Sequence, residues 1–308
     1  MKGPLFYAKI LLFGEYGIIK DSKGLAIPYN AYRGALKISE NLSGKSLASN
    51  ANLEHFYNYL STLKTDLVTF DLVSFKKDIQ NGMYFDSSIP QGYGVGSSGA
   101  LVASIYDKYA YDKITILENL TREKLLKLKE VFSLMESFFH GKSSGLDPLN
   151  SYLSLPILIN SKEHIEPAGI PSQKEGKGAV FLLDSEQVGE TEPMVNIFMN
   201  KMKNEGFRKM LNEEFVTYTD ACIEDFLHGN VTSLFGNVKN LSKVVLKNFK
   251  PMIPDAFHKV WEQGITTNDY YLKLCGSGGG GYILGFTEDY QKAQESLKDY
   301  KLELVYRL

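Results

Sequence analysis

Two glycine-rich runs, far apart in this 308-residue chain, constrain its fold more than any other feature. The first, at positions 90–100, reads Pro-Gln-Gly-Tyr-Gly-Val-Gly-Ser-Ser-Gly-Ala and leads into apolar residues at helical spacing. Glycines permit positive φ and close backbone approach, while the unpaired N–H groups of a first helical turn attract an anion such as a polyphosphate. The hydroxyls of Ser97 and Ser98 could add ligands for phosphate or Mg²⁺. This run therefore predicts a phosphate-binding loop that opens a helix.

The same run has two other interpretations. An isolated Gly-Ser cluster is usually a turn capped by serine, but three alternating glycines count against this interpretation. Gly94, Gly96 and Gly99 also fit Gly-x-Gly-x-x-Gly, yet residues 86–90 read as a turn and not as the buried strand that a dinucleotide-binding fold requires. Neither Gly-Lys-Ser triplet of the chain has the glycine five positions earlier that a Walker A loop needs. A phosphate loop of another kind is expected.

The second run, at positions 276–281, reads Gly-Ser-Gly-Gly-Gly-Gly and lies between two apolar segments that both read as strands, 271–275 and 282–286. So many glycines cost chain entropy. A flexible hairpin tip is one explanation. Close approach of the backbone to a ligand explains the density of glycine better.

An acidic constellation follows the clearest helical pattern, at 124–140. Glu136 lies near the end of this helix, Gly141 is a natural stop, and Ser-Ser-Gly-Leu-Asp-Pro follows at 143–148. Taken alone, Asp147 reads as an N-cap before a proline at the first helical position, and Glu136 as a partly buried surface carboxylate. These purely structural interpretations of Asp147 and Glu136 become less convincing when the acidic constellation is considered together with the two glycine runs.

Composition excludes several classes of function. The balance of 34 basic and 36 acidic residues gives a net charge of −2, so nucleic acid is not an expected partner. No apolar run approaches the ~20 residues that span a bilayer, and the apolar start contains Lys9 and no small-residue cleavage site. Cys222 and Cys275 form no disulfide or zinc pattern. We expect a soluble cytoplasmic protein that binds a small molecule and no membrane.

The pattern of apolar residues predicts an α+β chain in two halves. We expect strands at 7–13 and 34–38 and, flanking a turn-rich stretch at 166–178, at 152–159 and 179–183. Further helices are expected at 193–211, 215–227, 237–247 and 290–300. The turn-rich stretch is the best boundary, which gives domains at 1–170 and 171–308.

Three segments together resemble the GHMP kinase superfamily, named for galacto-, homoserine, mevalonate and phosphomevalonate kinases. They are Tyr-Ala-Lys-Ile-Leu-Leu-Phe-Gly-Glu-Tyr-Gly at 7–17, the run at 90–100, and Lys-Leu-Cys-Gly-Ser-Gly-Gly-Gly-Gly at 273–281. Their order matches the family, and the resemblance covers the chain from end to end. It implies two α+β domains, the first like ribosomal protein S5 domain 2 and the second an α/β sandwich, with the active site in the cleft between them.

Within that superfamily, the segment at 139–147 is similar to the His-Gly-x-Pro-Ser-Gly-x-Asp segment of mevalonate kinases, with Ser143 in place of the proline. The opening segment and residues 184–195 also look like that family. Mevalonate, converted to 5-phosphomevalonate for isoprenoid precursors, is therefore the leading acceptor. Tyr16 replaces the family's usual histidine and Ala8 replaces a glycine. Both departures concern the acceptor more than the chemistry.

The resemblance implies a role for each matching residue, with ATP and Mg²⁺ as cofactors. Asp147 would take the proton of the acceptor hydroxyl, and Lys9 would keep that carboxylate ionised, although a lysine extending out of a strand is the simpler structural explanation. Ser98 and Glu136 would ligate Mg²⁺. The ATP-binding residues would be Pro90, Gly92, Gly94, Gly96, Ser97, Ser98 and Gly99. Residues near the phosphates or the substrate would be Gly276, Ser277, Gly278 and Gly279, and the acceptor would meet Glu15, Tyr16, Ser144 and Gly145.

Three rival functions stay open on sequence alone. A kinase of this fold could act on phosphomevalonate, a sugar or a sugar-like alcohol, and the related diphosphomevalonate decarboxylase also uses MgATP. A nucleotide-binding regulator could have kept the fold and lost catalysis, but Lys9, Ser98, Glu136 and Asp147 are all present. A homodimer is an expectation from family analogy only.

Overall fold

The computed structural model describes residues 4–20, 22–115, 120–173 and 175–308, and it divides into two compact units. Each unit is assembled from separate stretches of the chain. The first unit comprises Met1–Lys9, Pro28–Pro90 and Gly96–Leu155, and the second comprises Ile10–Ile27, Gln91–Val95 and Pro156–Leu308. The predicted domain division at residue 170 stays a prediction. Lys174, in the expected boundary stretch, lies outside the described residues.

Within the described residues, the strands form two sheets. In one, β1 (Phe6–Phe13) pairs with β2 (Gly24–Ile38); β2 pairs antiparallel with β3 (Met83–Ser87) and β4 (Ile157–Ser161), and β4 pairs with β5 (His164–Pro167). The other has the order β7 (Tyr271–Leu274), β8 (Tyr282–Thr287), β6 (Ala179–Asp184) and β9 (Leu302–Arg307), with antiparallel neighbours. Strand β6 is central, and its first five residues are all buried apolar side chains, as in strands covered on both faces.

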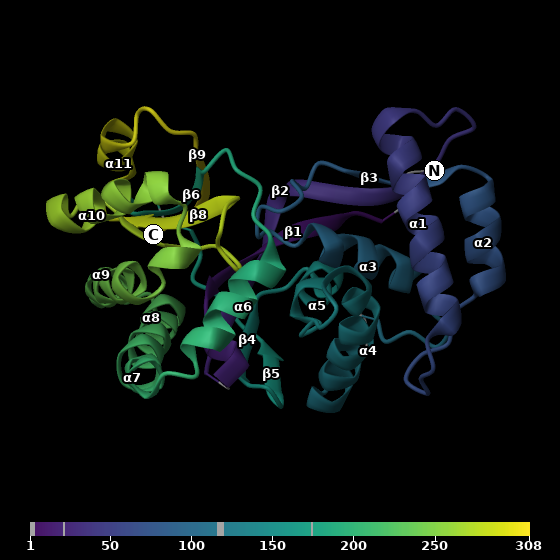
Figure 1. Ribbon diagram of the computed structural model, residues 1–308, viewed down its shortest axis with the longest axis horizontal. Helices are drawn as coiled ribbons and strands as arrows, with labels where there is room; N and C mark the ends of the chain where they lie inside the picture. Colours follow the sequence, from purple (N-terminus) through teal and green to yellow (C-terminus); the bar gives the residue numbers. More distant parts are fainter. Residues whose placement is uncertain (1–3, 21, 116–119, 174) are drawn as a thin grey trace. The chain divides into compact units, whose positions relative to one another are not determined.

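The described residues of the first unit form the helices α1 (Gly44–Thr62), α2 (Leu72–Gln80), α3 (Ser97–Tyr109), α4 (Arg122–His140) and α5 (Leu146–Leu153). Helices α1 and α2 lie side by side, and α3, α4 and α5 pack on one another (Figure 1). The rings of Tyr106, Phe132 and Tyr152 join these three helices edge to face, with centroids 5.0–5.6 Å apart. This aromatic core holds α3 and α5 in fixed positions relative to α4.

The second unit carries α6 (Thr191–Lys201), α7 (Glu205–Met210), α8 (Val216–His228), α9 (Val231–Asn248), α10 (His258–Thr267) and α11 (Tyr290–Ser296). Helices α8 and α9 lie side by side, and α9 and α10 contact β7 of the four-stranded sheet (Figure 1). The buried indole of Trp261 donates a 2.8 Å hydrogen bond to Ser242 Oγ, which fixes α10 against α9. A π-helical turn (Leu211–Phe215) joins α7 to α8, and 3₁₀ turns occur at Gly17–Lys20, Lys250–Met252 and Asp255–Phe257.

The predicted mixture of helices and antiparallel strands is confirmed, but three local predictions are wrong. Tyr152 and Leu153 end α5, and the strand begins at Ile157, because Pro156 separates the two apolar stretches. The helix predicted at 193–211 is interrupted before Asn204. The side chain of Asn204 accepts a 3.0 Å hydrogen bond from Phe207 N and so forms the N-cap of a new helix, α7. Asp86, predicted in a turn, belongs to β3.

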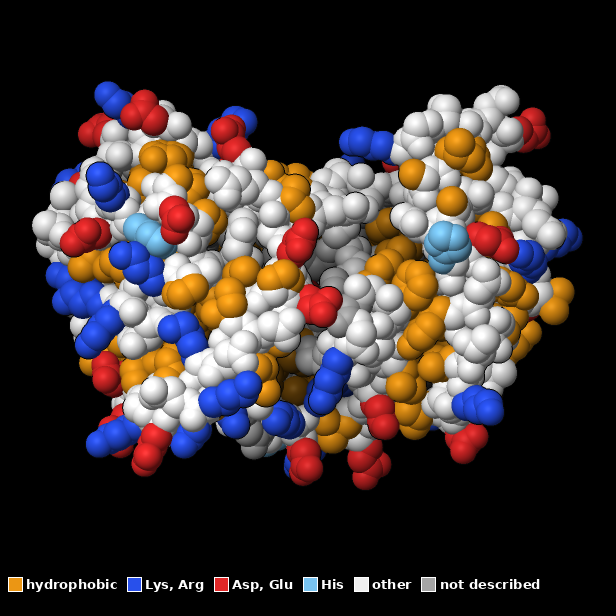
Figure 2. Space-filling model, in the orientation of Figure 1, with side chains coloured by type: hydrophobic (Ala, Val, Ile, Leu, Met, Phe, Trp, Pro, Cys, Tyr) orange, Lys and Arg blue, Asp and Glu red, His pale blue; other side chains and the backbone are white. Residues whose placement is uncertain are grey.

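None of the helices in the described part of the chain combines the length and apolar character that crossing a membrane requires. Lysine, arginine, aspartate and glutamate side chains are interspersed on the face drawn in Figure 2, in keeping with the small net charge.

Candidate active site

Lys9 and Asp147 form an ion pair inside the first unit. Lys9 Nζ lies 2.9 Å from Asp147 Oδ1; the lysine side chain is 5% exposed and the aspartate side chain 37% exposed. Lys9 comes from β1, and Asp147 lies in the first turn of α5, where the N-cap is Gly145. Asp147 is therefore not the N-cap, and its carboxylate remains accessible to a ligand while being paired with a buried cation.

Two glycines of α3 permit this arrangement. Gly96, the N-cap of α3, has φ +80°, and a Cβ there would lie 2.9 Å from Lys9 Cγ. A Cβ on Gly99 would lie 2.7 Å from the carbonyl carbon of Asp147. Helix α3 thus starts directly beside the ion pair, and its first turn leaves backbone N–H groups without helical acceptors. Such a helix start favours a bound anion.

Glu136 of α4 lies in the same cluster and is buried. Ser98 Oγ donates to its Oε1 at 3.1 Å, and Ser143 Oγ donates to Oε2. Ser143 also accepts a 3.0 Å bond from Gly145 N, which ties the carboxylate to the start of α5. Ser143, which replaces the family's proline, thus donates a hydrogen bond to the carboxylate that is predicted to bind the metal.

Burial raises the pKa of Glu136 from its ordinary 4.5 to about 8, and the negative charge of Asp147 adds to the shift. The hydrogen bonds from Ser143 and Ser98 and the charge of Lys9 act in the opposite direction. Two carboxylates and one ammonium therefore share this site, and a further positive charge would stabilise the ionised form of Glu136.

The second unit brings parts of both glycine runs together. Gly92 O accepts a 2.9 Å bond from Gly189 N, and Tyr93 O accepts a 3.3 Å bond from Tyr282 N. A Cβ on Gly94 would lie 2.5 Å from Cys275 O, so the backbones are in contact there. Glycine is required at Gly94 because two segments of backbone approach each other closely there. The close approach to a ligand that the sequence suggested stays a prediction.

Glu15 and Tyr16 also lie in the second unit, and both are buried. Glu15 Oε1 is 2.5 Å from the buried ammonium of Lys273. The Tyr16 hydroxyl donates a 2.6 Å bond to Ser277 O, and its ring lies 4.7 Å from that of Phe198. Tyr16 has φ +61°, a conformation that costs about 1–3 kcal/mol in a non-glycine residue and persists only where surrounding contacts impose it.

The other predicted residues lie on the edges of these clusters. Ser97 is the first residue of α3 and is half-buried, and Pro90 ends a segment of the first unit. Ser144 is exposed, and its Oγ accepts a bond from Leu146 N. Gly145 lies against α4, where a Cβ would be 2.0 Å from Lys129 O. The functional roles assigned to all these residues stay predictions.

Sequence reasoning did not single out Lys273 or the hydroxyl of Ser143. A lysine within the apolar strand β7 is a usable signal, because a buried ammonium needs a counter-charge. That signal does not name Glu15 as the partner, 258 positions earlier. For Ser143, the usable signal is that serine stands where the family has proline, because serine has a hydroxyl that can form hydrogen bonds and proline has none.

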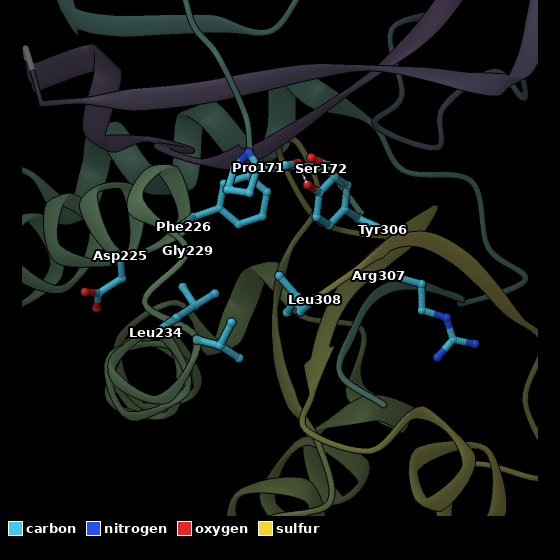
Figure 3. Close-up of a pocket in the computed structure, with 10 residues that line it drawn as sticks. Pro171, Ser172, Asp225, Phe226, Gly229, Leu234, Tyr306, Arg307 and Leu308 are labelled. Carbon is cyan, nitrogen blue, oxygen red and sulfur yellow. Dashed lines mark hydrogen bonds between the residues drawn. The ribbon is translucent and has the colours of Figure 1, made fainter. Parts of the chain in front are cut away.

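A pocket elsewhere in the second unit includes none of the predicted site residues. Its apolar centre is formed by Phe226, Leu234, Tyr306 and Leu308, and the charged ends of Asp225 and Arg307 point away from that centre (Figure 3). The remaining lining residues are Pro171, Ser172, Gly229 and Val231.

No protein-family model and no curated protein sequence matches the chain. Solved structures do match, over almost the full length. The chain is 17% identical to L. major mevalonate kinase in complex with R-mevalonate, with a TM-score of 0.64 and coverage of 97% of this chain and 94% of that one. For Streptococcus pneumoniae phosphomevalonate kinase in complex with phosphomevalonate and AMPPNP, the values are 14%, 0.61, 99% and 99%.

A third match is Lactococcus lactis galactokinase complexed with galactose, at 11% identity and a TM-score of 0.62, covering 98% of this chain and 92% of that one. The three similar structures are the kinds of kinase that give the GHMP superfamily its name. Similarity at this level of identity concerns the fold. The chain has the fold of the GHMP kinases.

Proposed function

We propose that this protein is an ATP-dependent kinase that transfers the γ-phosphoryl of MgATP to a hydroxyl of a small metabolite, with mevalonate as the leading acceptor. The observation that carries the proposal is the Lys9–Asp147 ion pair, 2.9 Å long, beside the start of α3. The family motifs and the fold support the same activity independently.

Asp147 is the group that accepts the proton of the acceptor hydroxyl. Its carboxylate is partly exposed and therefore reachable, whereas the Lys9 ammonium is buried and fixed at one of its oxygens. Phosphoryl transfer needs little covalent help, so positioning and neutralisation of charge dominate catalysis. Lys9 serves both, because it orients Asp147 and offers positive charge to the transferring group.

Ser98 and Glu136 would hold the metal ion. A hydroxyl and a carboxylate oxygen are hard ligands of the kind that Mg²⁺ prefers, and the two oxygens are 3.1 Å apart. The excess of carboxylate over ammonium in this cluster suits a divalent cation, which would supply charge neutralisation for the phosphates when bound. Ser143, on the second oxygen of Glu136, would orient that carboxylate.

The glycine loop would hold the phosphates. Backbone N–H groups at the start of α3 suit an anion, and glycines at positive φ let the chain approach it closely. The third motif, from Gly276 onward, contacts Gly94 of this loop within the second unit, and the family resemblance implies a place for it near the phosphates.

The choice of mevalonate as the acceptor rests on one sequence segment. The segment at 139–147 favours mevalonate, whereas the TM-scores of 0.64, 0.61 and 0.62 to proteins named for three different acceptors do not discriminate between them. Another GHMP-type acceptor is therefore the second candidate, favoured by the commitment of the Tyr16 hydroxyl to Ser277 where the family has histidine.

The test is ADP release by the purified protein with MgATP and each of mevalonate, phosphomevalonate, diphosphomevalonate, homoserine and galactose. We expect mevalonate-dependent ADP release without CO₂. ADP release with a different acceptor would support the same mechanism with that acceptor as the substrate. Release of CO₂ would identify a decarboxylase instead. ATP binding without turnover on any acceptor would contradict the proposed activity on this set.

A further inference from the structure

We propose that Tyr16 is a positioning residue whose hydroxyl holds the backbone of Ser277 and thereby fixes the glycine run at 276–281 for phosphoryl transfer. The proposal rests on the proposed function, in which that run contributes to the phosphate site. It assigns Tyr16 a role different from the substrate contact that the family resemblance implies.

The Tyr16 side chain is fully committed to this contact. Its hydroxyl donates a 2.6 Å hydrogen bond to Ser277 O, and the residue is 6% exposed. Burial, with a contribution from the charge of Glu15, raises the pKa of this hydroxyl, so that it keeps its proton and acts as the donor. Its ring packs against both Phe198 and Phe249, at centroid distances of 4.7 and 5.9 Å. The hydroxyl is therefore directed at one acceptor.

The glycine run needs such support at its beginning. Its five glycines, at φ from +70° to +150°, gain no stabilisation from side chains and lose much chain entropy on folding. The second half is held by Gly279 N donating to Met252 O at 2.7 Å and by Gly281 N donating to Gln187 O at 2.6 Å. In the first half, Ser277 is the residue with a side chain, and Tyr16 binds its carbonyl.

A neighbouring interaction anchors the preceding strand separately. Glu15 and Lys273 form a buried 2.5 Å ion pair, and Lys273 Nζ also donates to Leu274 O at 2.9 Å. Strand β7 therefore stays attached to residue 15 when the Tyr16 hydroxyl is removed. The change Tyr16→Phe should free the Ser277 carbonyl without displacing β7, and it leaves Ser277 held by the longer, 3.4 Å bond from its Oγ to Thr191 Oγ1.

Tyr270 provides a matched control in the same unit. Its buried hydroxyl donates a 2.8 Å bond to Val260 O, and no glycine run is involved. Tyr16→Phe and Tyr270→Phe thus remove equivalent tyrosine-to-carbonyl hydrogen bonds. We expect similar changes in thermal midpoint from both.

The two variants should differ in two readouts. Tyr16→Phe should lower kcat about tenfold to a hundredfold with little change in acceptor KM, because loosened backbone misplaces the reacting groups, while Tyr270→Phe leaves kcat near the wild-type value. Amide hydrogen exchange in the peptide covering 276–281 should be faster in Tyr16→Phe and unchanged in Tyr270→Phe.

Equal kcat and equal exchange in the two variants would overturn the proposal. A fall in kcat without faster exchange would also overturn it, since Tyr16 would then act on substrate directly. If the wild-type protein turns over none of the acceptors, the proposed function fails, and the exchange experiment by itself decides whether Tyr16 holds the run.

Discussion

The side chains of the first unit's cluster combine two carboxylates with one ammonium. Glu136 is buried, and Asp147 lies close enough to raise its pKa further. Lys9 compensates for part of this negative charge, and hydroxyls donate to both oxygens of Glu136. A site with this imbalance is typical of metal-binding and catalytic positions, where burial and neighbouring charge shift pKa values together.

The raised pKa of Glu136 predicts a pH-dependent stability in metal-free protein. In the folded state the group keeps its proton up to about pH 8, whereas in the unfolded state it loses the proton near its ordinary pKa of 4.5. Its contribution to stability is therefore present below about pH 4.5 and lost as pH rises through 8. We expect the difference in unfolding free energy between wild type and Glu136→Gln to shrink across this range.

The measurement is urea unfolding of both proteins in EDTA between pH 5 and pH 8.5. Glu130→Gln, on the exposed face of the same helix, is the matched control and should follow the wild-type pH profile. A Glu136→Gln profile parallel to that of the wild type would mean that Glu136 ionises normally in the fold.

At the scale of elements, the candidate site depends on how closely α3 approaches α5. Gly99 lies at this contact, because a Cβ there would meet Asp147 and Pro148 backbone at 2.7 and 2.8 Å. Gly99→Ala should therefore force the helices apart and destabilise the fold by about 1–3 kcal/mol, as overpacking does. It should also move Asp147 relative to Lys9 and reduce turnover.

Gly236 in α9 is the control for Gly99, because an added Cβ there would meet no atom within 4 Å. In a helix interior with free space, alanine is preferred over glycine by about 1 kcal/mol. Gly236→Ala should be neutral or stabilising in thermal unfolding and should leave activity unchanged. If both variants lost stability equally, the helix contact at Gly99 would not be tight.

The elements that the sequence predicts well are those with a strong local pattern. The helix at 124–140 has core residues at helical spacing, and the strand at 7–13 is apolar at every position except Lys9; both are present as α4 and β1. The error at 152–159 arose because a short apolar run is compatible with either structure, and tertiary packing against α3 favours helix for Tyr152. Helix α1 buries just three side chains and gives a weak periodic signal.

The candidate site likewise contains residues that the sequence identified and contacts that it did not. Lys9, Ser98 and Asp147 were identifiable because each lies in a recognisable motif, and Glu136 because it lies near the end of the clearest helical pattern, just before one of them. The fold brings these four residues together. Long-range pairs such as Glu15 with Lys273 were not identifiable, since neither local sequence encodes its partner. Motif order predicts which residues meet in a family; individual contacts depend on the packing.

For the whole molecule, the similarity to solved structures shows the GHMP kinase fold, and the phosphotransferase activity is our proposal from the charged cluster. Fold similarity alone does not separate a working kinase from a nucleotide-binding relative that has lost catalysis. The two possibilities differ in what removal of one carboxylate charge does. A kinase loses turnover and keeps its nucleotide, whereas a binding protein has no turnover to lose.

The most direct test is therefore acceptor-dependent ADP release by wild type and by Asp147→Asn, with MgATP affinity measured on both proteins. The amide has nearly the shape of the carboxylate and cannot accept the proton. We predict turnover by the wild type and a fall of about 10²–10⁴-fold in kcat for Asp147→Asn, with MgATP affinity changed by less than about threefold. Wild-type turnover in Asp147→Asn would contradict the assignment of Asp147 as the proton acceptor and, with it, the central claim about this site.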